Sequence, residues 1–242
     1  MSNTLIDRMI SATKIKGIDT LDNTKFFDRS TQIPTDVPMI NIALSGDIDG
    51  GFNSGLGVIA GPSKHYKSAS TLVLVKAYLD KHEDGIAIFY DSEFGTPPEY
   101  FKSFGIDMSR IVHIPIANIE ELKFDIVTKF EEINKKDNVM VFIDSIGNLA
   151  SKKEIDDAND AKSVADMTRA KQLKSFFRIV TPTLTTKDIP MVVINHTYDT
   201  QEMFSKQVVS GGKGVYYSAN WIWIIGRLQE KIGKEIVGYK FV

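Results

Sequence analysis

The sequence has 242 residues, of which 43% are hydrophobic and 25% are charged, a composition typical of one large globular domain with its own core. Its 29 basic and 31 acidic residues give a net charge of −2, which excludes a broadly basic surface. Contact with a nucleic acid would therefore have to come from local loops, or from a modest site repeated along a polymer. The absence of cysteine excludes disulfides and thiolate sites and favours the cytoplasm. With no secretory signal and no long apolar run, we expect no membrane partner.

Apolar segments of strand length alternate with segments of helical periodicity along most of the chain. A short amphipathic helix is predicted at 4–14, and a polar, interrupted arm follows it to residue 36. Strands are predicted at 56–60, 86–90, 111–114, 139–143, 191–194, 221–225 and 236–242, and helices at 67–82, 97–104 and 119–134, with a further long helix before residue 191.

This alternation predicts an α/β fold, because a helix that links two neighbouring strands leaves them parallel. We expect a mainly parallel central sheet with helices on both faces, formed by residues 37–242, and a separate N-terminal helix and arm at 1–36. The connections at 147–163 and 196–214 are too long and polar for simple turns. Loops of that length in a compact domain are usually functional or disordered.

A candidate phosphate-binding loop follows the first of these strands. It reads Gly61-Pro62-Ser63-Lys64-His65-Tyr66-Lys67-Ser68 and leads into a helix. It resembles the Walker A loop G-x-x-x-x-G-K-[ST], in which backbone N–H groups and the lysine bind phosphates and the hydroxyl binds Mg²⁺. Tyr66 stands in place of the second glycine, and we expect it to keep negative φ, since the left-handed region costs roughly 1–2 kcal/mol. An ordinary strand-to-helix turn with the same spacing is the alternative.

Carboxylates follow two other predicted strands. Asp144 ends the apolar run Val-Met-Val-Phe-Ile, the form of a Walker B strand, and is a candidate Mg²⁺ ligand. Glu93 follows the strand at 86–90 and is the candidate base that accepts a proton from water. Taken singly, Asp144 could be a helix cap and Glu93 part of a solvated acidic turn. Because ligands of open α/β sheets bind at the carboxyl ends of the strands, the three features together favour a nucleotide site.

These motifs resemble those of the RecA family, and among its members the phage recombinases of the UvsX type, from about Pro38 onward. The resemblance implies that ATP and Mg²⁺ are the cofactors, that Glu93 is the catalytic glutamate and that Tyr100 stacks on adenine. Pro97 stands where the family has an aspartate near the base, so adenine selectivity does not carry over. His196 ends the strand where the family has its nucleotide sensor, which is glutamine in RecA. A structural histidine is the alternative at that position.

The two long connections lie where the family has its DNA-binding loops. The candidate DNA contacts of the first connection are Lys152 and Lys153 within it and Arg169 after it, although this segment also contains several acidic residues. In the second they are Phe204, Lys206 and the Gly211-Gly212 hinge, which suit single strands because bases stack on aromatic rings and lysine binds phosphates. A mobile solvent loop is the alternative. Tyr216 replaces a lysine that RecA has at the subunit boundary, and Tyr217 retains the neighbouring interface aromatic.

The resemblance therefore implies a DNA-dependent ATPase that coats single-stranded DNA as a filament and promotes homologous pairing and strand exchange with duplex DNA. Single-strand-binding and mediator proteins are the expected partners, and the cytoplasm of a bacterial host is the expected location. Because the sequence ends at Val242, we expect it to lack the family's next strand, whose basic residues reach a neighbouring ATP, and the domain after it. The alternatives are a helicase-type ATPase and a non-hydrolytic module that binds ATP and DNA.

Overall fold

The computed structural model describes residues 4–15, 17–24, 32–160, 168–200 and 207–241, and the chain divides into two units, Met1–Thr31 and Gln32–Val242. The first unit contains helix α1 (Leu5–Ser11), which begins at a capping box formed by Thr4 and Asp7. This helix is shorter than the predicted segment 4–14. None of its residues is buried, and Leu5, Ile6 and Met9 are exposed.

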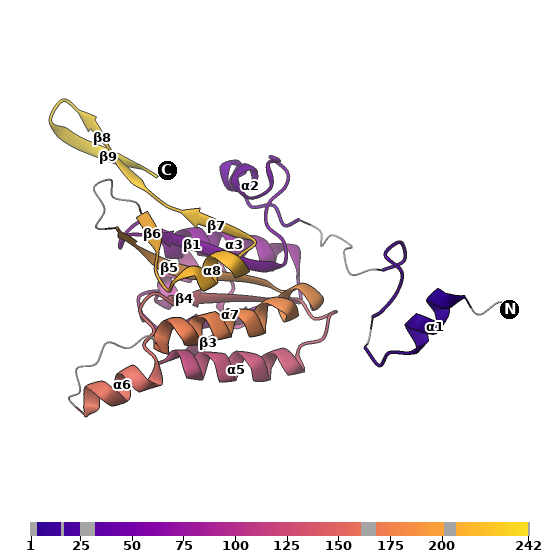
Figure 1. Ribbon diagram of the computed structural model, residues 1–242. Coiled ribbons are helices and arrows are strands. Elements are labelled where there is room, and N and C mark those ends of the chain that lie inside the picture. The colour runs from indigo at the N-terminus through magenta and orange to yellow at the C-terminus, as the bar shows by residue number, and fades with distance from the viewer. Residues whose placement is uncertain (1–3, 16, 25–31, 161–167, 201–206, 242) are drawn as a thin grey trace. The chain divides into compact units, whose positions relative to one another are not determined.

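The second unit is built on a central sheet whose neighbouring long strands all run parallel (Figure 1). In spatial order its strands are β3 (Ile111–Pro115), β2 (Ile86–Asp91), β4 (Val139–Asp144), β5 (Pro190–Asp199), β1 (Gly55–Gly61) and β7 (Trp221–Ile224), and the short β6 (Gln207–Val209) pairs antiparallel with β5. Every residue of β1 and β4 is buried, as expected for a sheet covered on both faces. The predicted α/β class and mainly parallel sheet are confirmed.

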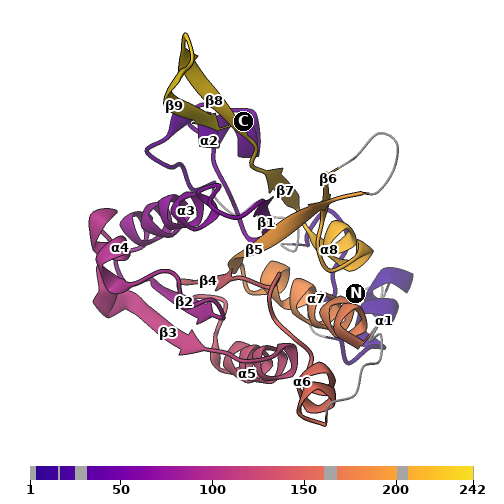
Figure 2. The same cartoon turned by 90° about the vertical axis from the view of Figure 1, so that its left-hand side faces the viewer.

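Helices cover both faces of the sheet, and Figure 2 shows the two layers. On one face, α3 (Lys67–Lys81) and α4 (Pro98–Ser103) share an apolar core with α2 (Pro38–Ser45). On the other, α5 (Ile119–Glu132), α7 (Thr168–Thr186) and α8 (Lys213–Ser218) share a second core. A 3₁₀ turn at Met108–Arg110 leads into β3. None of the helices in the described ranges has the length and apolar character to span a bilayer.

Strand register brings the polar strand ends to one edge of the sheet. Gly61 of β1 lies opposite His196 of β5, and Asp91 of β2 lies opposite Asp144 of β4. Parallel strands all end at the same edge, so the phosphate loop and the segments after β2, β4 and β5 emerge side by side.

Both long connections contain regular structure that the sequence pattern did not indicate. The first holds α6 (Lys152–Asn159), which begins at a capping box of Ser151 and Glu154. No residue of α6 is buried, so it lacks the apolar stripe by which helices are recognised in sequence. The second holds the end of β5, β6 and the start of α8. Strand β8 (Arg227–Ile232), also unpredicted, forms a hairpin with β9 (Glu235–Phe241).

Candidate functional site

The loop between β1 and α3 has left-handed backbone at two residues other than glycine. Lys64 has φ 61° and Tyr66 has φ 55° and ψ 27°. The expectation that Tyr66 keeps negative φ is wrong. The loop retains the left-handed turn that glycine normally provides there, at a cost of roughly 1–2 kcal/mol for a residue with a Cβ. The carbonyl of Tyr66 accepts hydrogen bonds from both the amide and the hydroxyl of Ser70, which helps hold this turn at the start of α3.

Lys67 is the first residue of α3, and its side chain folds back onto the loop. Its ammonium donates a 2.9 Å hydrogen bond to the carbonyl of Pro62, and the residue is 8% exposed. Burial lowers the pKa of Lys67, while the negative charges of Glu93 and Asp144 act in the opposite direction. A buried ammonium between a loop carbonyl and two carboxylates is suited to neutralising phosphate oxygens.

Ser68 and Asp144 meet across the edge of the sheet. The Ser68 hydroxyl donates a 2.6 Å hydrogen bond to Asp144 Oδ2, and the Thr96 hydroxyl donates to the same oxygen at 3.2 Å. Burial raises the pKa of Asp144, although these hydrogen bonds oppose the shift. Burial thus disfavours the ionised form of this carboxyl group, and a bound cation would relieve that effect.

Glu93 is held by donors from two other segments of the chain. Its Oε1 accepts from Ser145 Oγ at 2.5 Å and from Asn148 Nδ2 at 2.9 Å, and it lies 2.9 Å from His196 Nε2. Burial alone would raise the pKa of Glu93, but the hydrogen bonds from Ser145 and His196, with the charges of His196 and Lys67, hold it below its usual value. Glu93 is therefore an ionised carboxylate near neutral pH, as a general base must be.

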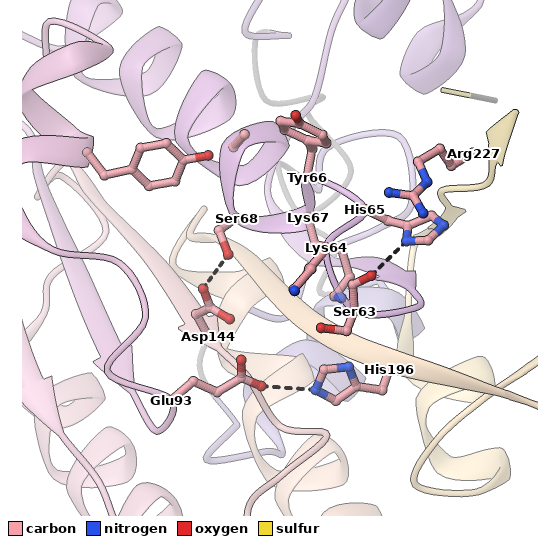
Figure 3. Close-up of a pocket in the computed structure, with 12 residues that line it drawn as sticks. Ser63, Lys64, His65, Tyr66, Lys67, Ser68, Glu93, Asp144, His196 and Arg227 are labelled. Carbon is pink, nitrogen blue, oxygen red and sulfur yellow. Dashed lines mark hydrogen bonds and ion pairs between the residues drawn. The ribbon is translucent and has the colours of Figure 1, made fainter. Parts of the chain in front are cut away.

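These side chains line one cavity of about 410 Å³ (Figure 3). Tyr100 of α4 lies on its wall and packs edge-on against Phe104. Arg227, at the start of β8, also lines the cavity, beside the phosphate loop. The complete lining is Ser63, Lys64, His65, Tyr66, Lys67, Ser68, Ala69, Glu93, Tyr100, Asp144, His196 and Arg227.

The oxygen donors in this cavity fit Mg²⁺ that arrives with phosphate groups. A hydroxyl and a carboxylate oxygen are hard ligands of the kind Mg²⁺ prefers, and the ion usually takes its other positions from phosphates and waters. Within the described ranges, no group of three or more His, Cys, Asp or Glu side chains could hold a metal by itself. Ser68 and Asp144 would therefore act together with a nucleotide.

The residues of the first connection that are expected to contact DNA differ in their hydrogen bonds and ion pairs. Arg169 donates hydrogen bonds to the carbonyls of Ile146, Gly147 and Leu149, so its guanidinium binds backbone within its own subunit. Lys153 pairs with Asp157 within α6, and Lys152 is exposed at the start of that helix.

In the second connection, Gly211 and Gly212 have φ of 91° and 78°, as a glycine hinge allows. Phe204 and Lys206 lie outside the described residues, and so do Phe26 and Phe27 of the N-terminal arm. Tyr216 accepts a 3.0 Å hydrogen bond from the amide of Val209, and Tyr217 is 80% exposed.

Four residues of the site were not predicted from the sequence. Thr96, Ser145 and Asn148 reach Asp144 or Glu93 only through the tertiary fold, and Arg227 enters the cavity from a strand that was not predicted. Ser145 alone had a positional clue, because it directly follows Asp144 at the end of β4.

The chain is similar in sequence to known recombination proteins. It matches the RecA N-terminal domain family over residues 16–240. It is 50% identical over 98% of its length to the "Recombination and repair protein" of Enterobacteria phage T4, covering 61% of that protein. It is 28% identical over 85% of its length to "Protein RecA" of Clavibacter michiganensis and 25% identical over 78% to that of Mesomycoplasma hyopneumoniae. It spans between 55% and 61% of the length of these three relatives. The chain belongs to the RecA family.

Proposed function

We propose that this chain is the ATPase core of a DNA recombinase, which binds ATP with Mg²⁺ and hydrolyses it in response to single-stranded DNA. One observation carries the proposal. A phosphate loop with its lysine, a hydroxyl–carboxylate pair and an ionised glutamate converge in one cavity at the carboxyl edge of a parallel sheet.

Each residue of the cavity has a task in this reaction. The backbone N–H groups of residues 63–68 and the ammonium of Lys67 bind the phosphates, since the start of α3 also favours negative charge. Ser68 and Asp144 hold Mg²⁺, which neutralises charge on the phosphate oxygens. Glu93 accepts the proton of the attacking water.

Tyr100 and His196 complete the nucleotide site at its two ends. Tyr100 packs against the base, because it is an aromatic residue on the cavity wall. His196 reports the terminal phosphate, a role supported by its contact with Glu93 and by its place in the lining of the cavity.

Single-stranded DNA binds the connections that follow β4 and β5. Both leave the sheet at the nucleotide edge, and the second carries Phe204, Lys206 and the glycine hinge. Copies of the chain assemble on the DNA strand as a filament. Because the net charge of each copy is close to zero, a single copy binds DNA weakly, and the filament repeats that weak binding site along the strand. The filament then pairs the strand with homologous duplex DNA, with single-strand-binding and mediator proteins assisting. The name of the phage T4 relative, a recombination and repair protein, supports this direction.

The test is DNA affinity as a function of salt. We expect the chain to prefer single strands, to tolerate any sequence and to weaken with salt by a slope of roughly −0.7 for each phosphate contact. Lys206→Ala should flatten that slope, and Phe204→Ala should weaken binding by roughly 1–3 kcal/mol if the ring stacks on a base. Lys136 is an exposed lysine just before β4, at the end of that strand away from the first connection. Lys136→Ala is the control, and it should change neither the salt slope nor the affinity. Equal affinity for duplex and single strands, or an unchanged slope in Lys206→Ala, would contradict the assignment.

A further inference from the structure

Glu93 is held by the segments that lead into both long connections. Ser145 directly follows β4, Asn148 lies at the start of the first connection, and His196, near the end of β5, is the first residue of the second. All three contacts converge on a single oxygen, Oε1. The orientation of the carboxylate therefore depends on where both segments lie.

The turn at residues 146–149 presents Asn148 to Glu93. Ile146 and Leu149 are buried at 0% and 2% exposure and anchor the two sides of the turn, while Asn148 between them is exposed and donates its amide to Glu93. The guanidinium of Arg169 donates to the carbonyls of Ile146 at 3.0 Å, Gly147 at 2.5 Å and Leu149 at 2.8 Å. Arg169 is the second residue of α7, the helix that follows the first connection, so it ties the chain beyond that connection to the turn.

The turn is also packed against the end of β5. A Cβ added to Gly147 would lie 2.3 Å from Cδ2 of His196, so only glycine allows this approach. The amide of Ile146 donates to the carbonyl of Ile194. If the turn moves, either the His196 ring must move with it or the hydrogen bond from Asn148, in the turn, to Glu93 must break.

We propose that Asn148 is a positioning residue that links the first connection to the catalytic carboxylate of Glu93. The inference rests on the proposed function, because it takes the first connection to be in contact with DNA. Asn148 lies three residues before Ser151, the cap of α6, and Arg169 lies at the other end of the connection. A DNA strand bound to that connection would act on the turn from both ends and, through the Asn148 amide, on Glu93.

The amide is suited to this task because it is a neutral donor of nearly the same shape as a carboxylate. Asn148→Ala removes the donor, and Asn148→Asp keeps the shape but places a second negative charge beside Glu93. A steric role would make the smaller alanine the more damaging change. A hydrogen-bonding role makes aspartate the more damaging one.

Kinetics on the chain as it exists, with a single-stranded oligonucleotide, form the first test. We expect KM for ATP to stay within about twofold of the parent, because Asn148 does not contact the phosphate loop. We expect DNA-stimulated kcat to fall about tenfold in Asn148→Ala, the lower end of what a hydrogen bond to a charged group contributes, and further in Asn148→Asp. Asn138→Ala is the matched control, since Asn138 also donates its amide to a carboxylate, Asp84, at the other end of β4. An unchanged kcat in both Asn148 variants, or a higher KM with kcat unchanged, would overturn the proposal.

A spectroscopic measurement separates this proposal from the proposed function. The carboxyl carbon of Glu93 is followed by ¹³C NMR, assigned with Glu93→Gln, before and after the oligonucleotide is added. The signal should move in the parent and in Asn138→Ala, and should stay in place in Asn148→Ala although the oligonucleotide binds. If DNA binds and the signal moves equally in all three proteins, the link through Asn148 is refuted while the proposed function stands. If the oligonucleotide does not bind the parent, the proposed function fails and the link fails with it.

Discussion

The Ser68 hydroxyl donates a 2.6 Å hydrogen bond to Oδ2 of Asp144, which joins residues 76 positions apart in the sequence. Ser68 lies in the helix that follows β1, and Asp144 is the last residue of β4. These two strands are not neighbours in the sheet, because β5 lies between them. The fold itself therefore brings a hydroxyl and a carboxylate together where Mg²⁺ and a nucleotide's phosphates are proposed to bind. Preorganised ligands of this kind avoid a cost of rearrangement when the nucleotide arrives.

Glu93→Gln should preserve ATP binding and lower turnover by about 10²–10⁴-fold, because the amide keeps the shape of the side chain but cannot accept the proton of water. Binding is measured with a fluorescent ATP analogue and turnover by phosphate release. Glu132→Gln, at the exposed end of α5, is the control that should leave both unchanged. Parental turnover in Glu93→Gln would remove Glu93 from the role of base and leave Asp91 as the candidate.

Ser145→Ala should move the acid limb of the pH–turnover profile to higher pH. Burial raises the pKa of Glu93, and the hydrogen bond from Ser145 is the largest of the effects that lower it. Loss of that donor therefore raises the pKa, and a base that must be ionised then becomes inactive at a higher pH. Ser109→Ala is the matched control, since Ser109 donates its hydroxyl to Asp107, remote from the cavity. An acid limb that stays in place in Ser145→Ala would contradict this electrostatic account.

Tyr66→Gly should give a more stable protein than Tyr66→Ala by roughly 1 kcal/mol, measured as the free energy of unfolding in urea. Both substitutions remove the ring, so their difference reports the backbone alone. Alanine keeps the Cβ that is unfavourable at φ 55°, whereas glycine adopts this conformation readily. Equal stability of the two variants would mean that the left-handed turn at Tyr66 carries no strain.

Arg169→Lys should lower the free energy of unfolding by about 1–3 kcal/mol, because lysine cannot reproduce the fork of donors that serves three carbonyl groups. Its positive charge is retained, so an electrostatic contact with DNA phosphates would largely survive. Affinity for single-stranded DNA, measured by fluorescence anisotropy at low temperature where the variant is folded, should stay near the parental value. A variant of parental stability with much weaker DNA binding would restore Arg169 as a DNA contact.

Much of the sheet was predictable because its strands are short, uninterrupted apolar runs. The clustering of Lys67, Ser68, Glu93, Asp144 and His196 was predictable for a related reason, since each lies at or just after the carboxyl end of a predicted strand and parallel strands end at one edge.

What could not be predicted depends on long-range packing or on special backbone geometry. The role of Arg169 depends on three carbonyl groups that lie 20 to 23 residues before it in the sequence. The spacing of apolar residues along the chain cannot indicate such contacts. The left-handed turn at Tyr66 contradicts the local preference of tyrosine, because the loop imposes it. Helix α6 was missed because it buries nothing and is started by its capping box rather than by an apolar face.

The most direct test of the central claim is phosphate release from ATP by this chain, with and without a single-stranded oligonucleotide. Lys67→Ala is the matched blank, because it removes the ammonium that is proposed to neutralise the terminal phosphates. The account predicts turnover that rises when the oligonucleotide is added and disappears in Lys67→Ala. Turnover that is the same with and without DNA, or that persists in Lys67→Ala, would contradict it.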